Sequence, residues 1–172
     1  MFSWRVTKYN PQNRDKSGRY QTDDWTSCGD IGKVHEGKIV TVEDYMRVEN
    51  AYIAAILLIL RVSGINNLRV KGLEKYSKKL HKDELSYSED MKKLLKVIRK
   101  GQRLEGKDIE NMCRLILREQ IWCELSNAKM FVHFGWDYYM YLGCMLEDKE
   151  VIKSIGKQGL YMEPMRSPYA KY

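Results

Sequence analysis

Few of the residues that commonly form cross-links, metal sites or membrane spans occur in this sequence. Its 4 cysteines, at positions 28, 113, 123 and 144, include no C-x-x-C pair and have no neighbouring histidine, so neither a zinc site nor a disulfide framework is indicated. We expect reduced, mostly buried thiols, no metal and no cofactor. The longest apolar run, AYIAAILLIL at 51–60, falls well short of the ~20 residues of a membrane-spanning helix and predicts a buried helix instead.

Catalytic signatures are also lacking. The sequence contains no G-x-S-x-G motif, no P-loop and no dinucleotide-binding fingerprint. The three histidines, His35, His81 and His133, have no partner motif, and the His35–Glu36 pair lacks the second histidine of a metalloprotease helix. The chain is therefore predicted not to be an enzyme. A small nuclease built on His35 or His133 stays open, because folding can bring distant side chains together.

Length and composition are those of one ordinary globular domain covering 1–172. There are only 3 prolines, and neither a low-complexity tract nor an internal repeat is visible. The first residues, MFSWRVTKYN, lack the apolar segment of a secretory signal, so we expect a cytoplasmic location.

Hydrophobic periodicity predicts strands at both ends of the chain and helices between them, which is an α+β fold with three main helices packed on a small antiparallel sheet. Segment 67–73 fits either a short strand or an extended connector. The expected elements are a strand at 3–9, a polar loop at 10–24, helices at 41–64, 88–101 and about 107–121, a strand–turn–strand at 128–144, a helical turn near 147–159 and a strand at 160–165.

The net charge of +7 comes from the middle of the chain. Residues 69–118 hold 15 Lys/Arg and 8 Asp/Glu, a balance of +7, whereas the flanking segments nearly cancel. Within the helix expected around 88–100, basic residues lie opposite an apolar stripe, and such a face is usually solvated surface. The alternative is nucleic-acid binding through phosphate contacts. That alternative would use Lys92, Lys93, Lys96, Arg99 and Lys100.

Aromatic residues gather in FVHFGWDYYMYLG, residues 131–143. Strand alternation places Tyr138 on the core side, with Tyr139 and Tyr141 on the opposite face. Helices covering that second face would make it core; otherwise it is a patch of amphipathic rings of the kind found at protein interfaces. Trp136 and Asp137 are expected to be exposed at the tip of the turn in either case.

An acidic stretch, DDWTSCGDIG, lies near the N-terminus. One interpretation is a structured turn in which Asp30 binds nearby backbone amides. The other is an acidic loop, with Asp23, Asp24 and Asp30, that presents Trp25 to a partner.

Five segments together resemble a family of small bacterial immunity proteins of polymorphic toxin systems, including contact-dependent growth inhibition. They are SWRVTKYN with DDWTSCGDIGK, the TVEDYMRVENAYIAAI helix, and FVHFGWDYYMYLG with GLYMEPMRSPY. The resemblance implies a cytoplasmic, non-enzymatic protein that binds and neutralises a cognate toxin domain, often a nuclease. The chain's net charge of +7 differs from the acidic character that is usual in inhibitors of basic nucleases. Either the toxin is acidic, or the docking face lies outside 69–118, an option that the nearly neutral remainder permits, with Asp23, Asp24, Asp30 and Asp137 as its acids.

Overall fold

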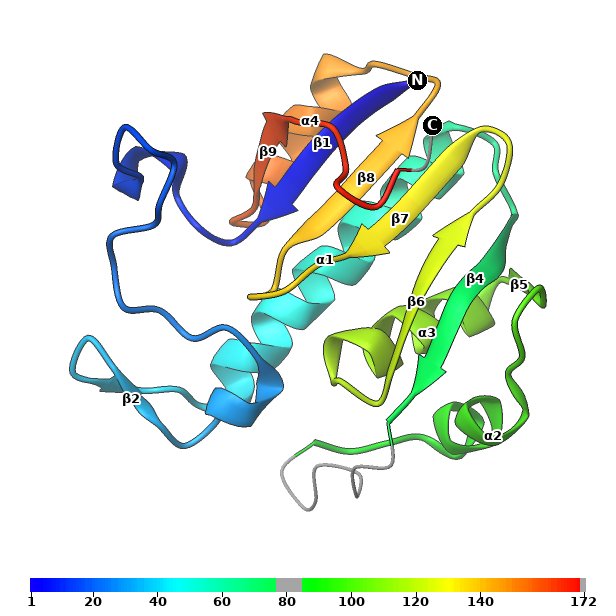
Figure 1. Ribbon diagram of the computed structural model, residues 1–172, viewed down its shortest axis with the longest axis horizontal. Coiled ribbons are helices and arrows are strands. Elements are labelled where there is room, and N and C mark those ends of the chain that lie inside the picture. Colours follow the sequence, from blue (N-terminus) through cyan, green and yellow to red (C-terminus); the bar gives the residue numbers. More distant parts are fainter. Residues whose placement is uncertain (77–84, 171–172) are drawn as a thin grey trace.

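The computed structural model describes residues 1–76 and 85–170, which form a seven-stranded sheet with helices against it (Figure 1). The strand order is β5-β4-β6-β7-β8-β1-β9, and each neighbouring pair is antiparallel. The α+β prediction is confirmed. The strands are β1 (Phe2–Thr7), β4 (Asn67–Lys75), β5 (Arg103–Glu105), β6 (Ile121–Ser126), β7 (Met130–Phe134), β8 (Met140–Cys144) and β9 (Tyr161–Pro164), with a separate hairpin of β2 (Val34–His35) and β3 (Lys38–Ile39).

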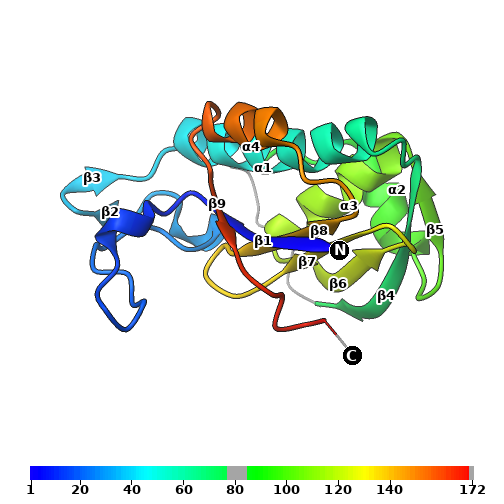
Figure 2. The same ribbon diagram turned by 90° about the horizontal axis from the view of Figure 1, so that it is seen from above.

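The helices lie on one side of the sheet, and the chain after β9 crosses the other side (Figure 2). They are α1 (Val42–Val62), α2 (Glu89–Val97), α3 (Lys107–Leu117) and the short α4 (Lys149–Gly156). None of the helices in the described ranges has both the length and the apolar character of a membrane span.

Helix α1 begins and ends where its sequence predicts. The Thr41 hydroxyl accepts a hydrogen bond from the Asp44 amide at 3.0 Å, which satisfies one of the free amides of the first turn. Gly64 follows the helix at φ 62, a left-handed conformation that glycine adopts without steric cost. Between these ends, Tyr45, Tyr52 and Ile56 are buried against the sheet.

A buried ion pair joins α1 to α3, and the apolar pattern gives no sign of it. Glu49 is fully buried, and both of its carboxylate oxygens accept hydrogen bonds from Arg118, at 2.7 Å each. Arg114 adds a third bond at 2.6 Å. These three side chains meet from two helices and satisfy each other inside the core.

Two expected helix ends are wrong. Helix α2 stops at Val97, because Ile98 turns to extended backbone (ψ 137) and Lys75 donates to the terminal carbonyls of Leu95 and Lys96. Helix α3 stops at Leu117, and Ile121 opens strand β6 instead of continuing the helix. A buried Ile at this spacing fits a helix face and a strand equally well, so periodicity alone cannot separate them.

Candidate functional site

The turn between β7 and β8 has an unusual backbone. The amide of Gly135 donates to the carbonyl of Tyr139 at 2.8 Å, and the Tyr139 amide donates to the carbonyl of Trp136 at 3.2 Å. The two central residues, Asp137 and Tyr138, both have left-handed backbones, with φ of 56 and 62. This is the pattern of a type I′ hairpin turn, whose twist matches the flanking strands. Because a bulky residue such as Tyr138 rarely adopts that conformation, something must hold it there.

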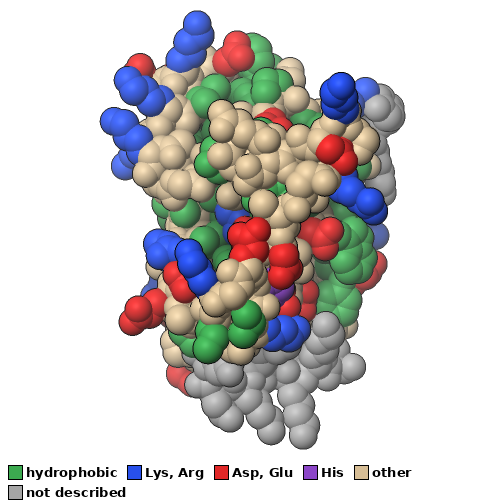
Figure 3. Space-filling view, turned by 90° about the vertical axis from the view of Figure 1, so that its left-hand side faces the viewer, with side chains coloured by type: hydrophobic (Ala, Val, Ile, Leu, Met, Phe, Trp, Pro, Cys, Tyr) green, Lys and Arg blue, Asp and Glu red, His purple; other side chains and the backbone are tan. Residues whose placement is uncertain are grey.

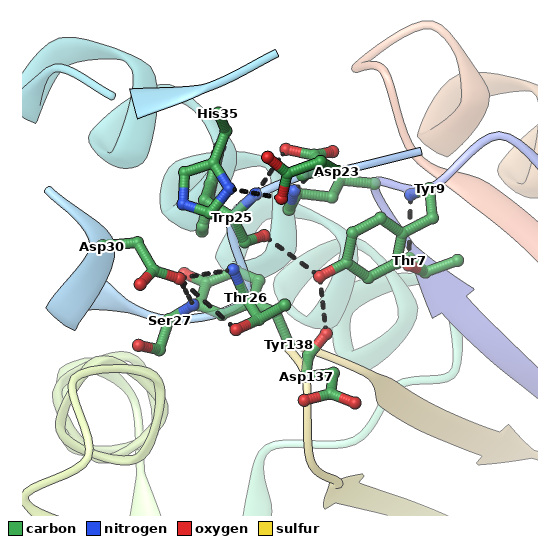
Figure 4. Close-up of polar contacts among 12 residues, drawn as sticks. Thr7, Tyr9, Asp23, Trp25, Thr26, Ser27, Asp30, His35, Asp137 and Tyr138 are labelled. Atoms are coloured by element: carbon green, nitrogen blue, oxygen red, sulfur yellow. Dashed lines mark hydrogen bonds and ion pairs between the residues drawn. The ribbon is translucent and has the colours of Figure 1, made fainter. Parts of the chain in front are cut away.

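Two tyrosine hydroxyls hold the turn from outside. The Tyr9 hydroxyl lies 2.7 Å from the carbonyl oxygen of Asp137 and 3.1 Å from that of Trp25, so its single proton is shared between these two acceptors (Figure 4). The Tyr52 hydroxyl, from α1, donates to the carbonyl of Tyr138 at 2.8 Å. The Tyr138 ring packs edge-on against Trp25, Tyr45 and Tyr52, with centroid distances of 5.0, 5.9 and 5.1 Å.

Trp136 projects from this fixed turn and is 82% exposed. A neighbouring cavity of about 430 Å³ runs beneath the turn toward the end of α3 and the start of β6. Its floor is apolar and its walls are largely aromatic. The lining residues are Thr26, Ser27, Glu74, Tyr76, Ile116, Leu117, Glu119, Ile121, Trp122, Phe134, Gly135, Trp136, Asp137, Tyr138, Tyr139 and Tyr169. Figure 3 shows the side of the molecule on which the loop after β1 and the β2–β3 hairpin lie. On this side, acidic side chains lie near the middle and basic ones mostly toward the margins.

The acidic loop is a structured turn. One carboxylate oxygen of Asp30 accepts from the amides of Thr26 and Ser27 at 2.8 and 3.2 Å, and the other lies 3.0 Å from the Lys33 ammonium. Burial opposes ionisation of Asp30, but these contacts outweigh it and lower its pKa. The interpretation of Asp30 as a backbone-binding turn residue is confirmed.

The other two acids of this loop are also paired within the chain. Asp24 lies 2.7 Å from the ammonium of Lys8, and Asp23 lies 2.9 Å from Nδ1 of His35. Burial lowers the pKa of Lys8 to about 8, although Asp24 opposes the shift. Trp25 is only 7% exposed, so the expectation that this loop presents Trp25 to a partner is wrong. The aromatic residue that this region displays is Trp136 instead.

The tyrosines expected on the second face do lie there, on the side of the sheet away from the helices. Arg14 donates to the Tyr139 hydroxyl at 3.1 Å, and the guanidinium of Arg5 lies 5.4 Å from the Tyr139 ring centre. Tyr141 is buried, with the ring of Tyr169 at 6.2 Å. The C-terminal segment therefore covers part of this face, and Tyr138 faces the core as predicted.

The structure describes two of the three histidines, His35 and His133, and their surroundings differ. His133 is buried, its Nδ1 lies 2.8 Å from the hydroxyl of Ser167, and its ring stacks on Phe131 at 4.4 Å. Burial, with a contribution from Lys71, lowers the pKa of His133 to about 4. His81 lies outside the described residues. No cluster of three metal-ligating side chains occurs among the residues that the structure describes.

The basic residues of the nucleic-acid alternative do not share one helix face. Lys92 pairs with Glu89 at 2.8 Å, while Lys93 and Lys96 are exposed on α2. Arg99 and Lys100 lie beyond the helix end.

Comparison with protein-family models, curated proteins and solved structures finds no match to this chain. The arrangement of the site is therefore what bears on function. It unites the predicted Trp136, Asp137 and Tyr139 with Glu74, Glu119 and Trp122, which sequence reasoning missed. Gly72 in β4 is a sequence feature that could have indicated these residues. It lies where the register with β6 shifts between Lys71 and Glu74, and a glycine inside a strand often marks such a bulge.

Proposed function

We propose that this protein is a non-enzymatic inhibitor of another protein, and specifically an immunity protein that neutralises a cognate toxin domain, such as a nuclease, in the cytoplasm of the producing cell. The observation that carries the proposal is Trp136, which is 82% exposed on a turn held by buried hydrogen bonds. Tryptophan is strongly enriched among the residues that dominate binding at protein interfaces.

The rigidity of the turn supports binding rather than an accidental exposure. Ordering a flexible loop upon association costs free energy, and a loop already fixed in the free protein avoids much of that cost. Here Tyr9 and Tyr52 fix the backbone of Asp137 and Tyr138, while the adjacent indole stays in solvent. The fold thus stabilises a strained turn and displays a large apolar ring on it.

Charge also favours a protein partner at this end of the molecule. No described lysine or arginine of the basic segment 69–118 lines the cavity beside Trp136. The described residues that this segment contributes to the lining are Glu74, Tyr76, Ile116 and Leu117. The expected docking acid Asp137 does line the cavity, whereas Asp23, Asp24 and Asp30 are paired within the chain. An acidic and aromatic surface suits a basic protein better than a nucleic-acid phosphate backbone.

The proposal is tested by capturing the partner of the tagged protein from its host at ~150 and ~500 mM salt, since the higher concentration removes most phosphate-driven contacts. We expect one protein at equal stoichiometry in both washes. Trp136→Ala should lose it, whereas Tyr161→Ala, a partly exposed aromatic residue on β9, should retain it. The captured protein should be toxic when expressed alone and harmless when co-expressed with this chain.

Other outcomes would overturn the proposal. Recovery of nucleic acid alone, lost at ~500 mM salt, would favour the nucleic-acid alternative and make Lys93 and Lys96 the residues to change. If Trp136→Ala retains the captured protein as well as the parent does, the turn is not the binding site. If the captured protein is not toxic, the protein is not an immunity protein.

A further inference from the structure

The described residues that line the cavity beside Trp136 carry a charge opposite to that of the protein as a whole. The chain carries 30 Lys and Arg against 23 Asp and Glu. Nevertheless, the described residues that line the cavity include three carboxylates, Glu74, Glu119 and Asp137, and no lysine, arginine or histidine. Aromatic residues make up much of the rest of the lining. The aromatic lining residues are Tyr76, Trp122, Phe134, Trp136, Tyr138, Tyr139 and Tyr169.

Aromatic faces and carboxylates together make a site for an organic cation. A ring attracts a cation through the negative charge of its face, and a carboxylate adds a charge-assisted hydrogen bond. The same chain uses this combination internally. The ammonium of Lys8 lies 4.0 Å from the ring centre of Trp25, 4.3 Å from that of Tyr9 and 2.7 Å from Asp24.

We infer that the cavity receives an arginine side chain of the partner protein, with Trp136 beside its entrance. This inference rests on the proposed function for the identity of the partner. Arginine fits better than lysine because its planar guanidinium can stack on a ring and bind a carboxylate at the same time. Arg14 makes both kinds of contact within the chain, lying 5.5 Å from the ring centre of Tyr139, itself a residue of the cavity lining, and 3.8 Å from Glu163.

The walls of the cavity are built before any ligand enters. The indole of Trp122 donates to the carbonyl of Phe134 at 3.0 Å, which fixes the wall formed by β6 and β7. Gly72 lies under that indole at φ +59, and a Cβ there would approach the ring to 3.2 Å. Glycine thus permits both the bulge in β4 and the close approach of Trp122.

Glu74 and Glu119 both lie close enough to Tyr76 for their charges to act on its hydroxyl. Burial raises the pKa of Tyr76, and the charges of Glu74 and Glu119 raise it further. Within the described ranges, no basic side chain forms an ion pair with Glu74 or Asp137. A guanidinium in the cavity would supply the positive charge that these two acids lack there.

The inference is tested without the partner by titrating the ¹⁵N-labelled protein with the blocked peptide acetyl-Gly-Arg-Gly-amide. We expect the indole resonances of Trp136 and Trp122 to shift with a dissociation constant of about 1 mM, the range of a single buried contact. The isosteric citrulline peptide, which lacks the charge, should bind at least about ten-fold more weakly, because the charged interaction is absent.

Two double variants complete the test. Glu74→Gln with Asp137→Asn should weaken arginine-peptide binding about ten-fold and leave the citrulline peptide unaffected, because only the charge of the cavity changes. Asn tolerates the left-handed backbone of position 137 as well as Asp does. The matched control is Asp108→Asn with Glu147→Gln, an exposed pair outside the cavity with the same change in net charge, and it should bind as the parent does.

Equal binding of the arginine and citrulline peptides, equal loss in both double variants, or no indole shift up to about 20 mM peptide, well above the expected dissociation constant, would each overturn the arginine assignment. None of these results would bear on capture of a toxin through Trp136. Conversely, failure to capture a toxin would leave a measured cation site intact.

Discussion

The hydroxyl of Tyr9 donates to the backbone carbonyl of Asp137 at 2.7 Å, which joins positions 128 residues apart in the sequence. The bond connects the loop after β1 to the turn that displays Trp136. It also brings the carbonyl of Trp25 to the same hydroxyl at 3.1 Å. A single side chain therefore ties the structured acidic loop to the exposed turn.

We predict that Tyr9→Phe destabilises the protein by about 1–3 kcal/mol, because the carbonyl groups of Asp137 and Trp25 lose the one proton that they share. The free energy of unfolding in urea measures this loss. Tyr20→Phe is the control, since the Tyr20 ring packs on Tyr9 at 4.9 Å but its hydroxyl bonds to none of the described residues. A loss of similar size in both variants would show that the bond from Tyr9 contributes little.

We predict that Glu49→Ala destabilises the protein by about 3–5 kcal/mol. The change removes the carboxylate that accepts two hydrogen bonds from the buried guanidinium of Arg118 and leaves it neutral acceptors such as the Ser86 carbonyl, and a buried charge without its counter-charge is far more costly than the pair itself is stabilising. Urea unfolding again measures the effect, with Glu43→Ala on the exposed face of α1 as the control.

The double variant Glu49→Leu with Arg118→Met should recover much of the loss, because both fully buried charges are then removed while Arg114 keeps its pairing with Glu110 at 2.9 Å. A double variant as unstable as Glu49→Ala would contradict this explanation.

Features of the fold that depend on neighbouring residues were predictable from the sequence, whereas features that depend on residues far apart in the chain were not. Thr41, Ser88 and Gly64 act on their own neighbours, so the start of α1, the start of α2 and the end of α1 follow from local sequence. The end of α2 depends on Lys75, some 20 residues away, whose ammonium binds the carbonyls of Leu95 and Lys96. No local pattern announces that contact.

The candidate site divides in the same way. The tip of the hairpin is a local property, so Trp136 and Asp137 were correctly expected to be exposed. Burial of Trp25 depends on Tyr45 and Tyr138, which reach it from other segments. Glu74 and Trp122 reach the cavity only because β4 pairs with β6 through a bulge. Tertiary pairing of this kind cannot be read from one strand's alternation.

We predict that stability falls as the pH drops from about 6.5 toward 4, in part because of His133. Its pKa is lowered to about 4 in the folded protein, whereas an unfolded histidine titrates near 6.5, so the unfolded chain binds the extra proton first. The full contribution is present above pH ~6.5 and declines through this window, by up to about 3 kcal/mol. Urea unfolding of the parent and of His133→Gln between these pH values measures it. A His133→Gln variant that keeps the parent's slope would assign the loss to carboxylates instead.

Two glycines should respond to alanine with opposite signs. Gly143 on β8 lies opposite Phe131 on β7, and a Cβ there would fall within the van der Waals radius of the Phe131 ring. The ring cannot move away freely because it stacks on His133 at 4.4 Å. We therefore expect Gly143→Ala to destabilise the protein by about 1–3 kcal/mol, as an overpacked contact does.

A methyl group on Gly156, the last residue of α4, would meet no atom within 4 Å, and the backbone there is not left-handed. Alanine restricts the unfolded chain more than glycine does, so Gly156→Ala should stabilise by up to about 1 kcal/mol. Urea unfolding of both variants measures the two signs. A methyl group at position 143 would also displace the Phe131 ring, which shields His133. The histidine would then titrate closer to its ordinary pKa, so Gly143→Ala should reduce the protein's loss of stability between pH ~6.5 and ~4. A Gly143→Ala protein with unchanged stability and an unchanged pH slope would show that Phe131 has room to move and does not keep His133 buried.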